Sequence, residues 1–175
     1  MRTVYHANPT ESGALVSLIR DYKATLLGAT PTFMEGMLAK ARGTDDLAPL
    51  QYAFVGAEKC PDHVYKAFAA QCPGASLCEG YGITECSPVV AVNRPGNAVP
   101  GTIGHVLPSV TAAIVVEDED GNTSRARQAQ TNETGMLLVR GKSIFSGYLV
   151  ASNDPPPNPF VEFEGEKWYR TGDLL

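Results

Sequence analysis

The sequence predicts an α/β fold, in which part of a parallel sheet with flanking helices is followed by a small β subdomain that forms a partial barrel. Three observations support this prediction. Helical patterns and short apolar runs alternate through the first half of the chain. Proline and glycine punctuate residues 95–108, and short strand patterns between turn residues fill the second half. The predicted domains are therefore residues 1–98 and residues 99–175.

Three helices and three strands are predicted in the first half of the chain. The helices cover about residues 10–23, 31–43 and 61–71, and the strands cover residues 24–29, 51–55 and 76–79. Thr10 is an expected N-cap, and Pro31 suits a first helical turn. Strands and helices that alternate at this spacing favour a parallel sheet with helical crossovers. The strand at 76–79 is expected to lead into a turn made by Gly80, Tyr81 and Gly82.

Short strands separated by turns are predicted in the second half. They cover residues 111–116, 135–140, 145–149 and 167–170. An acidic turn is expected at 117–122 and a polar loop at 123–133. Residues 153–159 contain four prolines, which predicts a loop or rigid spacer.

Composition excludes several classes of function. The formal net charge is −5 and there is no run of Lys or Arg, which argues against a nucleic-acid binder and against a basic membrane-surface stripe. No apolar stretch reaches membrane-spanning length, and the N-terminus has no signal-peptide core. The chain is therefore predicted to be soluble and cytoplasmic. Its cysteines, at 60, 72, 78 and 86, form no CxxC pair, so buried thiols are favoured over a zinc site.

The first group of candidate functional residues runs from Gly80 to Glu85, where a predicted strand ends. Ligands bind beyond the carboxyl ends of strands in open parallel sheets, and glycine allows close backbone approach. Tyr81 offers an aromatic face to a purine, Thr84 a hydroxyl to a phosphate, and Glu85 a carboxylate oxygen of the kind Mg²⁺ prefers beside phosphates. The alternative is a simple Gly-Tyr-Gly turn with a solvated glutamate.

Two further groups are weaker when each stands alone. Asp173 follows Thr171-Gly172 and can accept hydrogen bonds from a ribose diol, or it can cap its own turn. Residues 56–59, Gly-Ala-Glu-Lys, follow a predicted strand and suit backbone contacts to a ligand. An exposed turn is the alternative for these residues.

In their order along the chain, these groups resemble the AMP-forming acyl-activating (adenylate-forming) superfamily. Its signature Tyr-Gly-x-Thr-Glu appears at residues 81–85, and Tyr-Arg-Thr-Gly-Asp-Leu appears at 169–174. Three further segments are similar to parts of the family pattern. Residues 100–108 resemble its linker, residues 133–141 its Gly-Glu-Leu-x-Val-x-Gly segment, and residues 145–149 its Gly-Tyr segment. Residues 29–33 and 56–59 most resemble the bacterial acyl-acyl-carrier-protein synthetase / 2-acylglycerophosphoethanolamine acyltransferase branch.

The resemblance implies a role for each matching residue. Tyr81, beside Gly82, would stack on adenine, and Gly56, Ala57 and Glu58 would line the adenine site and one wall of the acyl tunnel. Thr84 would contact the α-phosphate and Glu85 would help hold Mg²⁺, which makes these two the expected catalytic residues. Asp173 would bind the ribose hydroxyls.

The implied reaction has two steps. A fatty acid or other carboxylate attacks the α-phosphorus of ATP, which gives acyl-AMP and pyrophosphate, and a thiol of acyl carrier protein or CoA then displaces AMP. The cofactors implied are ATP/AMP and Mg²⁺. A full-length parent is expected in the cytoplasm, with attachment to the inner membrane as the alternative.

Two elements of the family pattern do not appear in the sequence. The chain contains neither the Ser/Thr/Gly-rich phosphate loop nor the domain with the catalytic lysine, and it stops just after the Thr-Gly-Asp-Leu motif. We therefore expect an internal fragment that is inactive by itself. A non-catalytic adenylate-binding or interaction module is the alternative, whereas a dinucleotide oxidoreductase is disfavoured because no Gly-x-Gly-x-x-Gly follows a strand.

Overall fold

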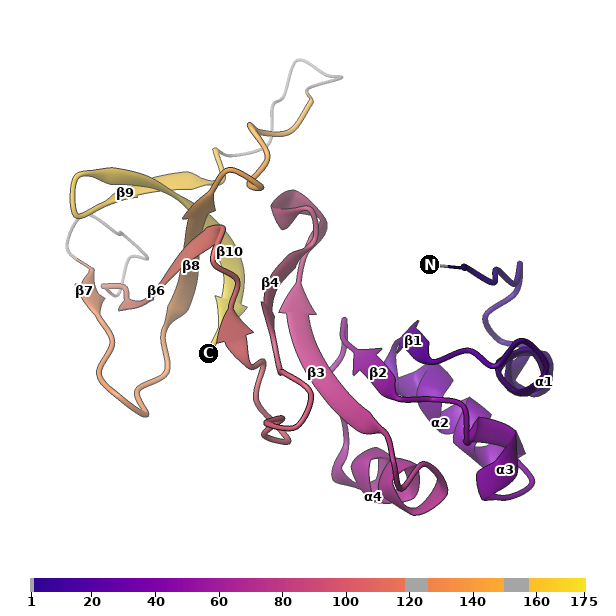
Figure 1. Ribbon diagram of the computed structural model, residues 1–175. Coiled ribbons are helices and arrows are strands. Elements are labelled where there is room, and N and C mark those ends of the chain that lie inside the picture. The colour runs from indigo at the N-terminus through magenta and orange to yellow at the C-terminus, as the bar shows by residue number, and fades with distance from the viewer. Residues whose placement is uncertain (1, 119–125, 150–157) are drawn as a thin grey trace. The chain divides into compact units, whose positions relative to one another are not determined.

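The computed structural model describes residues 2–118, 126–149 and 158–175, and the chain divides into two compact units (Figure 1). Unit 1 comprises Met1–Ile83 and Val89–His105, and unit 2 comprises Thr84–Pro88 and Val106–Leu175. One of the boundaries between the units, at 83/84, therefore falls inside the Tyr-Gly-x-Thr-Glu signature. The predicted division into domains at 98/99 stays a prediction.

Unit 1 contains the predicted sheet and its helices. Its helices are α1 (Ser12–Tyr22), α2 (Pro31–Lys40), α3 (Thr44–Leu47) and α4 (Asp62–Gln71). The strands are β1 (Leu26–Ala29), β2 (Tyr52–Val55), β3 (Ser76–Gly82), β4 (Val89–Val92) and β5 (His105–Val106), hydrogen-bonded in that order. β1, β2 and β3 are parallel, as predicted, but β4 runs antiparallel to β3, so the sheet is mixed.

The helices of unit 1 bury their apolar faces in one core. Met34 of α2 and Phe68 of α4 are almost fully buried with Val16 of α1 and Val55 of β2. Thr30 caps α2, because its side chain accepts a hydrogen bond from the Phe33 N–H at 3.3 Å, and Pro31 follows it. These local signals explain why α2 begins where the sequence predicts it, although it ends at Lys40 and not near residue 43.

The predicted N-cap of the first helix is wrong. Glu11 holds the N-cap position of α1 and makes no capping bond through its side chain. The Thr10 hydroxyl instead donates to Oδ1 of Asn8 at 2.7 Å, so it is engaged before the helix begins.

Unit 2 is an antiparallel sheet that follows the α/β part. Its strands are β6 (Val110–Val116), β7 (Arg127–Gln128), β8 (Met136–Gly141), β9 (Phe160–Phe163) and β10 (Glu166–Leu174), in the order β7-β6-β8-β10-β9. The sheet curls around buried Leu138, Phe163 and Trp168, which agrees with the predicted partial barrel (Figure 1). The α/β fold class is therefore confirmed.

Several boundaries in the second half are wrong. Residues 145–149 form no strand, because the Phe145 N–H donates to the Glu85 carbonyl instead of a strand ladder. β10 extends four residues beyond the predicted 167–170, and the short strand β7 lies inside the predicted polar loop. The acidic turn, that loop and the proline-rich segment fall partly outside the described residues.

The four cysteines are buried thiols, as predicted. Burial raises the pKa of Cys60, Cys72 and Cys86 to about 11, so these thiols stay protonated at neutral pH. Among the described residues, no helix combines the length and apolar character that crossing a membrane requires.

Candidate nucleotide-binding site

Two of the predicted nucleotide-binding segments touch in unit 1. Residues 56–59 connect β2 to α4, and the Gly56 N–H donates to the Ala29 carbonyl at 3.4 Å. A Cβ atom at Gly56 would lie 2.9 Å from the Gly80 carbonyl oxygen, closer than real Cβ contacts come. Glycine at 56 therefore lets this segment pack against the strand that carries Tyr81.

The remainder of the segment is exposed and partly strained. Ala57 has φ of 68°, a left-handed conformation that a residue with a Cβ rarely adopts. Glu58 accepts a hydrogen bond from the Thr32 hydroxyl at 2.7 Å, which fixes it to the first turn of α2. The segment thus presents an unusual but defined backbone, as a ligand-binding turn requires.

Gly80, Tyr81 and Gly82 lie inside β3 and do not form the predicted turn. Tyr81 pairs with Ala91 of β4, and the register shifts between Tyr81 and Gly82. A Cβ at Gly80 would come within 3.1 Å of the Ala91 carbonyl oxygen, so glycine is what allows β4 to approach here. Tyr81 itself is half-buried.

Thr84 and Glu85 belong to unit 2, in a short 3-10 turn spanning Thr84–Cys86. Thr84 is exposed and Glu85 is half-buried. The Tyr148 hydroxyl donates to Oε1 of Glu85 at 2.8 Å, and the Phe145 N–H donates to the Glu85 carbonyl at 2.8 Å. Segment 145–149, which resembles the family's Gly-Tyr segment, therefore orients the predicted metal-binding carboxylate.

An aromatic cluster supports this arrangement. The Phe145 ring lies 4.8 Å from that of Tyr148 and 5.3 Å from that of Tyr169, between ring centroids. Burial raises the pKa of Tyr169, and its hydrogen bond with Tyr148 and the charge of Glu85 raise it further. Tyr169 is thus neutral at physiological pH, and the negative charge beside it is that of Glu85.

Asp173 lies in β10 at an irregularity of the sheet. The pairing of β10 with β8 shifts between Arg170 and Leu174, and Gly172 has φ of 87°. The Asp173 N–H donates to the Thr171 hydroxyl at 3.1 Å, and that hydroxyl donates to the Leu137 carbonyl at 2.9 Å. Thr171 and Gly172 therefore hold Asp173 in a fixed, half-buried position.

The site residues thus form two groups, one in each unit. In unit 1, Gly56 of segment 56–58 packs on Gly80, in the strand that carries Tyr81 and Gly82. Thr84 and Glu85 share one turn of unit 2, and Asp173 lies on β10 of the same unit.

Sequence reasoning missed two residues that support these groups. One is Tyr148, the partner of Glu85; the other is Glu79, a buried glutamate on β3. A signal for Glu79 was present, because an acidic residue directly after Leu77-Cys78 in an apolar strand must find partners when it is buried. Tyr148 lies in the segment that resembles the family's Gly-Tyr segment, but its pairing with Glu85, 63 residues away, had no local signal.

Glu85 suits a magnesium ion that is held mainly by phosphates. Mg²⁺ in such sites takes one or two carboxylates together with substrate oxygens, not a protein cage. Within the part of the chain that the structure describes, no group of three or more His, Cys, Asp or Glu residues could hold a metal by itself. A single oriented carboxylate therefore fits Mg²⁺ bound with a nucleotide.

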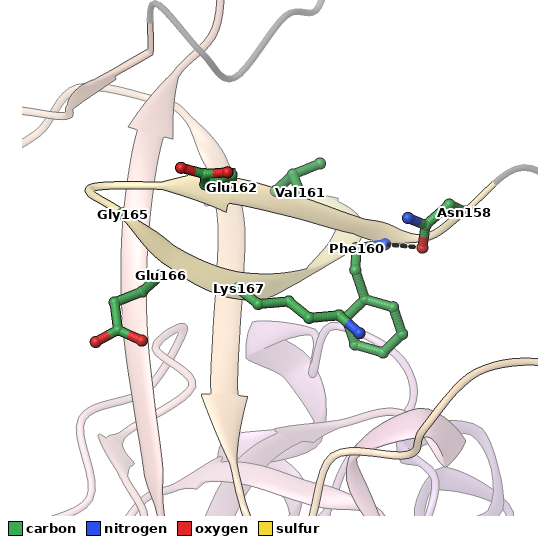
Figure 2. A pocket seen from close by; sticks show the side chains of 7 residues that line it. All are labelled: Asn158, Phe160, Val161, Glu162, Gly165, Glu166 and Lys167. Atoms are coloured by element: carbon green, nitrogen blue, oxygen red, sulfur yellow. Dashed lines mark hydrogen bonds between the residues drawn. The ribbon is translucent and has the colours of Figure 1, made fainter.

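A separate concavity of about 410 Å³ lies on the hairpin of β9 and β10 (Figure 2). Lys167 reaches over the Phe160 ring, with Nζ 4.1 Å from its centroid, and Asn158 Oδ1 accepts from the Phe160 N–H at 3.1 Å. The described residues that line it include none of the predicted site residues. The concavity therefore lends no support to the nucleotide assignment.

Comparison with known proteins matches most of this chain. The sequence profile described as "AMP-binding enzyme" matches residues 1–149. 4-coumarate–CoA ligase 3 of Oryza sativa subsp. japonica is 33% identical over 93% of this chain and 28% of its own length. Anthranilate–CoA ligase of Pseudomonas aeruginosa is 31% identical over 95% of this chain and 29% of its own length. The chain thus spans less than a third of these two relatives.

Solved structures show the same fold. A long-chain-fatty-acid–CoA ligase of Archaeoglobus fulgidus matches with a TM-score of 0.74 and 25% identity, over 94% of this chain and 34% of that one. The anthranilate CoA ligase AuaEII, solved with anthranoyl-AMP, matches with a TM-score of 0.77 and 22% identity, over 98% of this chain and 31% of that one. With a family profile that covers most of its residues, this chain belongs to the AMP-binding enzyme family.

Proposed function

We propose that this protein takes part in the ATP-dependent activation of a carboxylic acid, in which an acyl-AMP forms and a thiol then accepts the acyl group. The observation that carries the proposal is the close packing of Gly56 on β3. A Cβ atom at position 56 would lie only 2.9 Å from the Gly80 carbonyl oxygen. This packing supports the proposal that residues 56–58 and the strand of Tyr81 contact one ligand. The family match supports a ligand that contains AMP.

In this proposal the residues of unit 1 bind the adenine. Tyr81 stacks on the base, Gly82 leaves room for it, and residues 56–58 contact it through their backbone. An aromatic ring that stacks on a base contributes about 1–3 kcal/mol to binding. Unit 1 therefore contributes the contacts to the base.

The residues of unit 2 bind the ribose and the phosphate. Asp173 accepts hydrogen bonds from the ribose hydroxyls, and Thr84 donates one to the α-phosphate, where charge develops as the carboxylate attacks. Glu85, oriented by Tyr148, helps to hold Mg²⁺, which neutralises phosphate charge when it is bound. Catalysis here consists of positioning and charge neutralisation.

The substrate is a carboxylic acid and the acceptor is a thiol. The relatives are CoA ligases whose names specify coumarate, anthranilate and medium-chain acyl groups, which supports CoA as the acceptor and an acyl or aryl carboxylate as the substrate. Residues 29–33 and 56–59 favour a fatty acid with acyl carrier protein as the alternative acceptor. The residues assigned here bind and orient, so we propose that this chain alone binds adenylate without forming it.

Calorimetric titration of the chain with AMP tests the proposal. Tyr81→Ala should weaken AMP binding about 5- to 150-fold through lost stacking, and Asp173→Asn about 10- to 150-fold through lost charge-assisted hydrogen bonds. The matched controls are Tyr22→Ala, at an exposed tyrosine of α1, and Asp45→Asn, at an exposed aspartate of α3. Both should bind AMP like the unaltered chain.

The result that would contradict the proposal is a folded chain that does not bind AMP, or binding that Tyr81→Ala and Asp173→Asn leave unchanged. Incubation with ATP, Mg²⁺ and carboxylic acids completes the test, because pyrophosphate exchange by the chain alone would contradict the assignment of binding without catalysis.

A further inference from the structure

A carboxylate is buried where the two nucleotide-binding segments of unit 1 meet. Glu79 of β3 is 5% exposed. Its Oε1 accepts a hydrogen bond from the Cys60 N–H at 3.0 Å, and its Oε2 accepts one from the Tyr65 hydroxyl at 2.7 Å. Burying a carboxylate is costly unless it is hydrogen-bonded, so these donors are needed at this position.

The first donor fixes one end of segment 56–60. The Cys60 N–H directly follows residues 56–59 and precedes Pro61, the N-cap of α4. The other end of the segment is held by the Gly56 N–H bond to Ala29 and by the packing of Gly56 on Gly80. Glu79 is the neighbour of Gly80, so both ends of the segment are anchored on the same part of β3.

The backbone between these anchors is strained. Ala57 has φ of 68°, a conformation that persists in a residue with a Cβ only when the surrounding structure imposes it. The Thr32 hydroxyl holds the Glu58 side chain from the α2 side, whereas the Cys60 N–H ties the backbone that follows Ala57 to β3. The Glu79–Cys60 bond therefore gives this backbone an anchor on β3 that helps to keep Ala57 and Glu58 in their observed conformation.

Asn93 extends this network to residues 99–102, because its Oδ1 accepts a hydrogen bond from the Val99 N–H at 2.9 Å. Asn93, also buried, donates through its side chain to the Glu79 carbonyl at 3.1 Å and to the Thr102 carbonyl at 2.6 Å. The Asn93 side chain thus links Glu79 of β3 to the chain between β4 and β5.

We propose that Glu79 is the positioning residue for the adenine-binding segment, and that it acts through the Cys60 N–H to hold Ala57 and Glu58 in the conformation that meets the nucleotide. The identity of the ligand in this inference rests on the proposed function, whereas the anchoring of segment 56–60 does not. Tyr65 secures the other oxygen of Glu79.

Amide hydrogen exchange measured residue by residue tests the anchoring without any ligand. Glu79→Met removes both acceptors, and the Cys60 amide should then exchange about tenfold faster than in the control Val16→Ala, because a bond to a charged acceptor is lost. Val16 is a core residue of α1, outside the network, so its variant reports the effect of general destabilisation. Glu79→Gln keeps an acceptor for the Cys60 N–H and should restore its protection.

Binding of AMP provides the second readout. Glu79→Met should weaken AMP binding about tenfold or more, whereas Glu79→Gln and Val16→Ala should bind within about threefold of the unaltered chain. Equal exchange at Cys60 in Glu79→Met and Val16→Ala would overturn the anchoring. Unchanged AMP affinity in Glu79→Met would overturn the link between Glu79 and nucleotide binding. If the unaltered chain fails to bind AMP, the proposed function is overturned, and the exchange data still decide whether Glu79 anchors the segment.

Tyr65→Phe keeps the inference testable if Glu79→Met does not fold. This variant leaves the Glu79–Cys60 bond in place and removes the hydroxyl that donates to the other oxygen of Glu79. The Cys60 amide should then exchange within about threefold of its rate in the control Val16→Ala. A rise of about tenfold or more over that control would contradict the anchoring of segment 56–60 by Glu79.

Discussion

Substitution of Gly56 by alanine tests whether the two segments of unit 1 are held as tightly as the geometry implies. The added Cβ would lie 2.9 Å from the Gly80 oxygen and 3.7 Å from the Gly80 carbonyl carbon. Both neighbours are backbone atoms, so no side chain can rotate away. Either segment 56–59 or β3 must therefore shift by a few tenths of an ångström.

The size of the effect follows from two opposing contributions. Forcing an extra methyl into a packed site typically costs about 1–3 kcal/mol. Replacing glycine lowers the entropy of the unfolded chain and returns about 0.4–1 kcal/mol, because Gly56 does not have a positive φ. The expected net loss in the free energy of unfolding is about 1–2 kcal/mol.

Urea denaturation and AMP titration measure the consequences. Gly74→Ala is the matched control, since an added Cβ there meets nothing within 4 Å. Gly56→Ala should unfold at a lower urea concentration than this control and bind AMP about tenfold more weakly, because the displaced segment no longer meets the base. Equal stability and equal affinity of the two variants would refute the close approach on which the site is built.

Three further predictions concern other parts of the chain. Gly104→Ala should lower the free energy of unfolding, measured in urea, by about 3 kcal/mol or more. Residue 104 has φ of 82°, and its added Cβ would lie 2.2 Å from backbone atoms of residues 92 and 93. The control Gly101→Ala has φ of 76° but open space around the added Cβ, so it should lower the free energy of unfolding less. Hydrogen bonds from the Arg127 side chain and the Gln130 N–H lower the pKa of Glu133 to about 2, so its contribution to stability is present above the unfolded pKa near 4.5 and is lost as pH falls toward 2. Glu133→Gln should therefore flatten the decline of the urea midpoint over this range, and an equally steep decline would contradict the assignment. Tyr148→Phe should change the Mg²⁺ dependence of ATP binding measured by calorimetry, because Glu85 loses the hydroxyl that orients it. AMP binding without Mg²⁺ should stay the same. An unchanged Mg²⁺ dependence would contradict the assignment of Glu85 to the metal.

The elements predicted well are those with local signals. α2 has a capping threonine and a proline in its first turn, and α4 has its apolar residues on one face, so both lie within a few residues of their predicted positions. β4 was missed because the run Val89–Val92 becomes a strand only by pairing with β3. The same pairing draws Gly80, Tyr81 and Gly82 into β3, although their composition indicates a turn.

The site divides in the same way between local and non-local information. Its segments were found because their residues are contiguous and ordered along the chain. The partners that fix them were not found, because Glu79 reaches back 19 residues to Cys60, and Tyr148 reaches back 63 residues to Glu85. Such contacts depend on which segments lie side by side in the fold. Composition and periodicity do not encode this arrangement.

The most direct measurement is the change in backbone amide chemical shifts when AMP is added to the isotope-labelled chain. The account predicts that the amides of residues 56–60 and of residues 80–82 shift together and saturate at the same AMP concentration, because both segments contact one base. Shifts confined to other residues, or two segments that saturate at different concentrations, would contradict the claim that they form a single adenine-binding site.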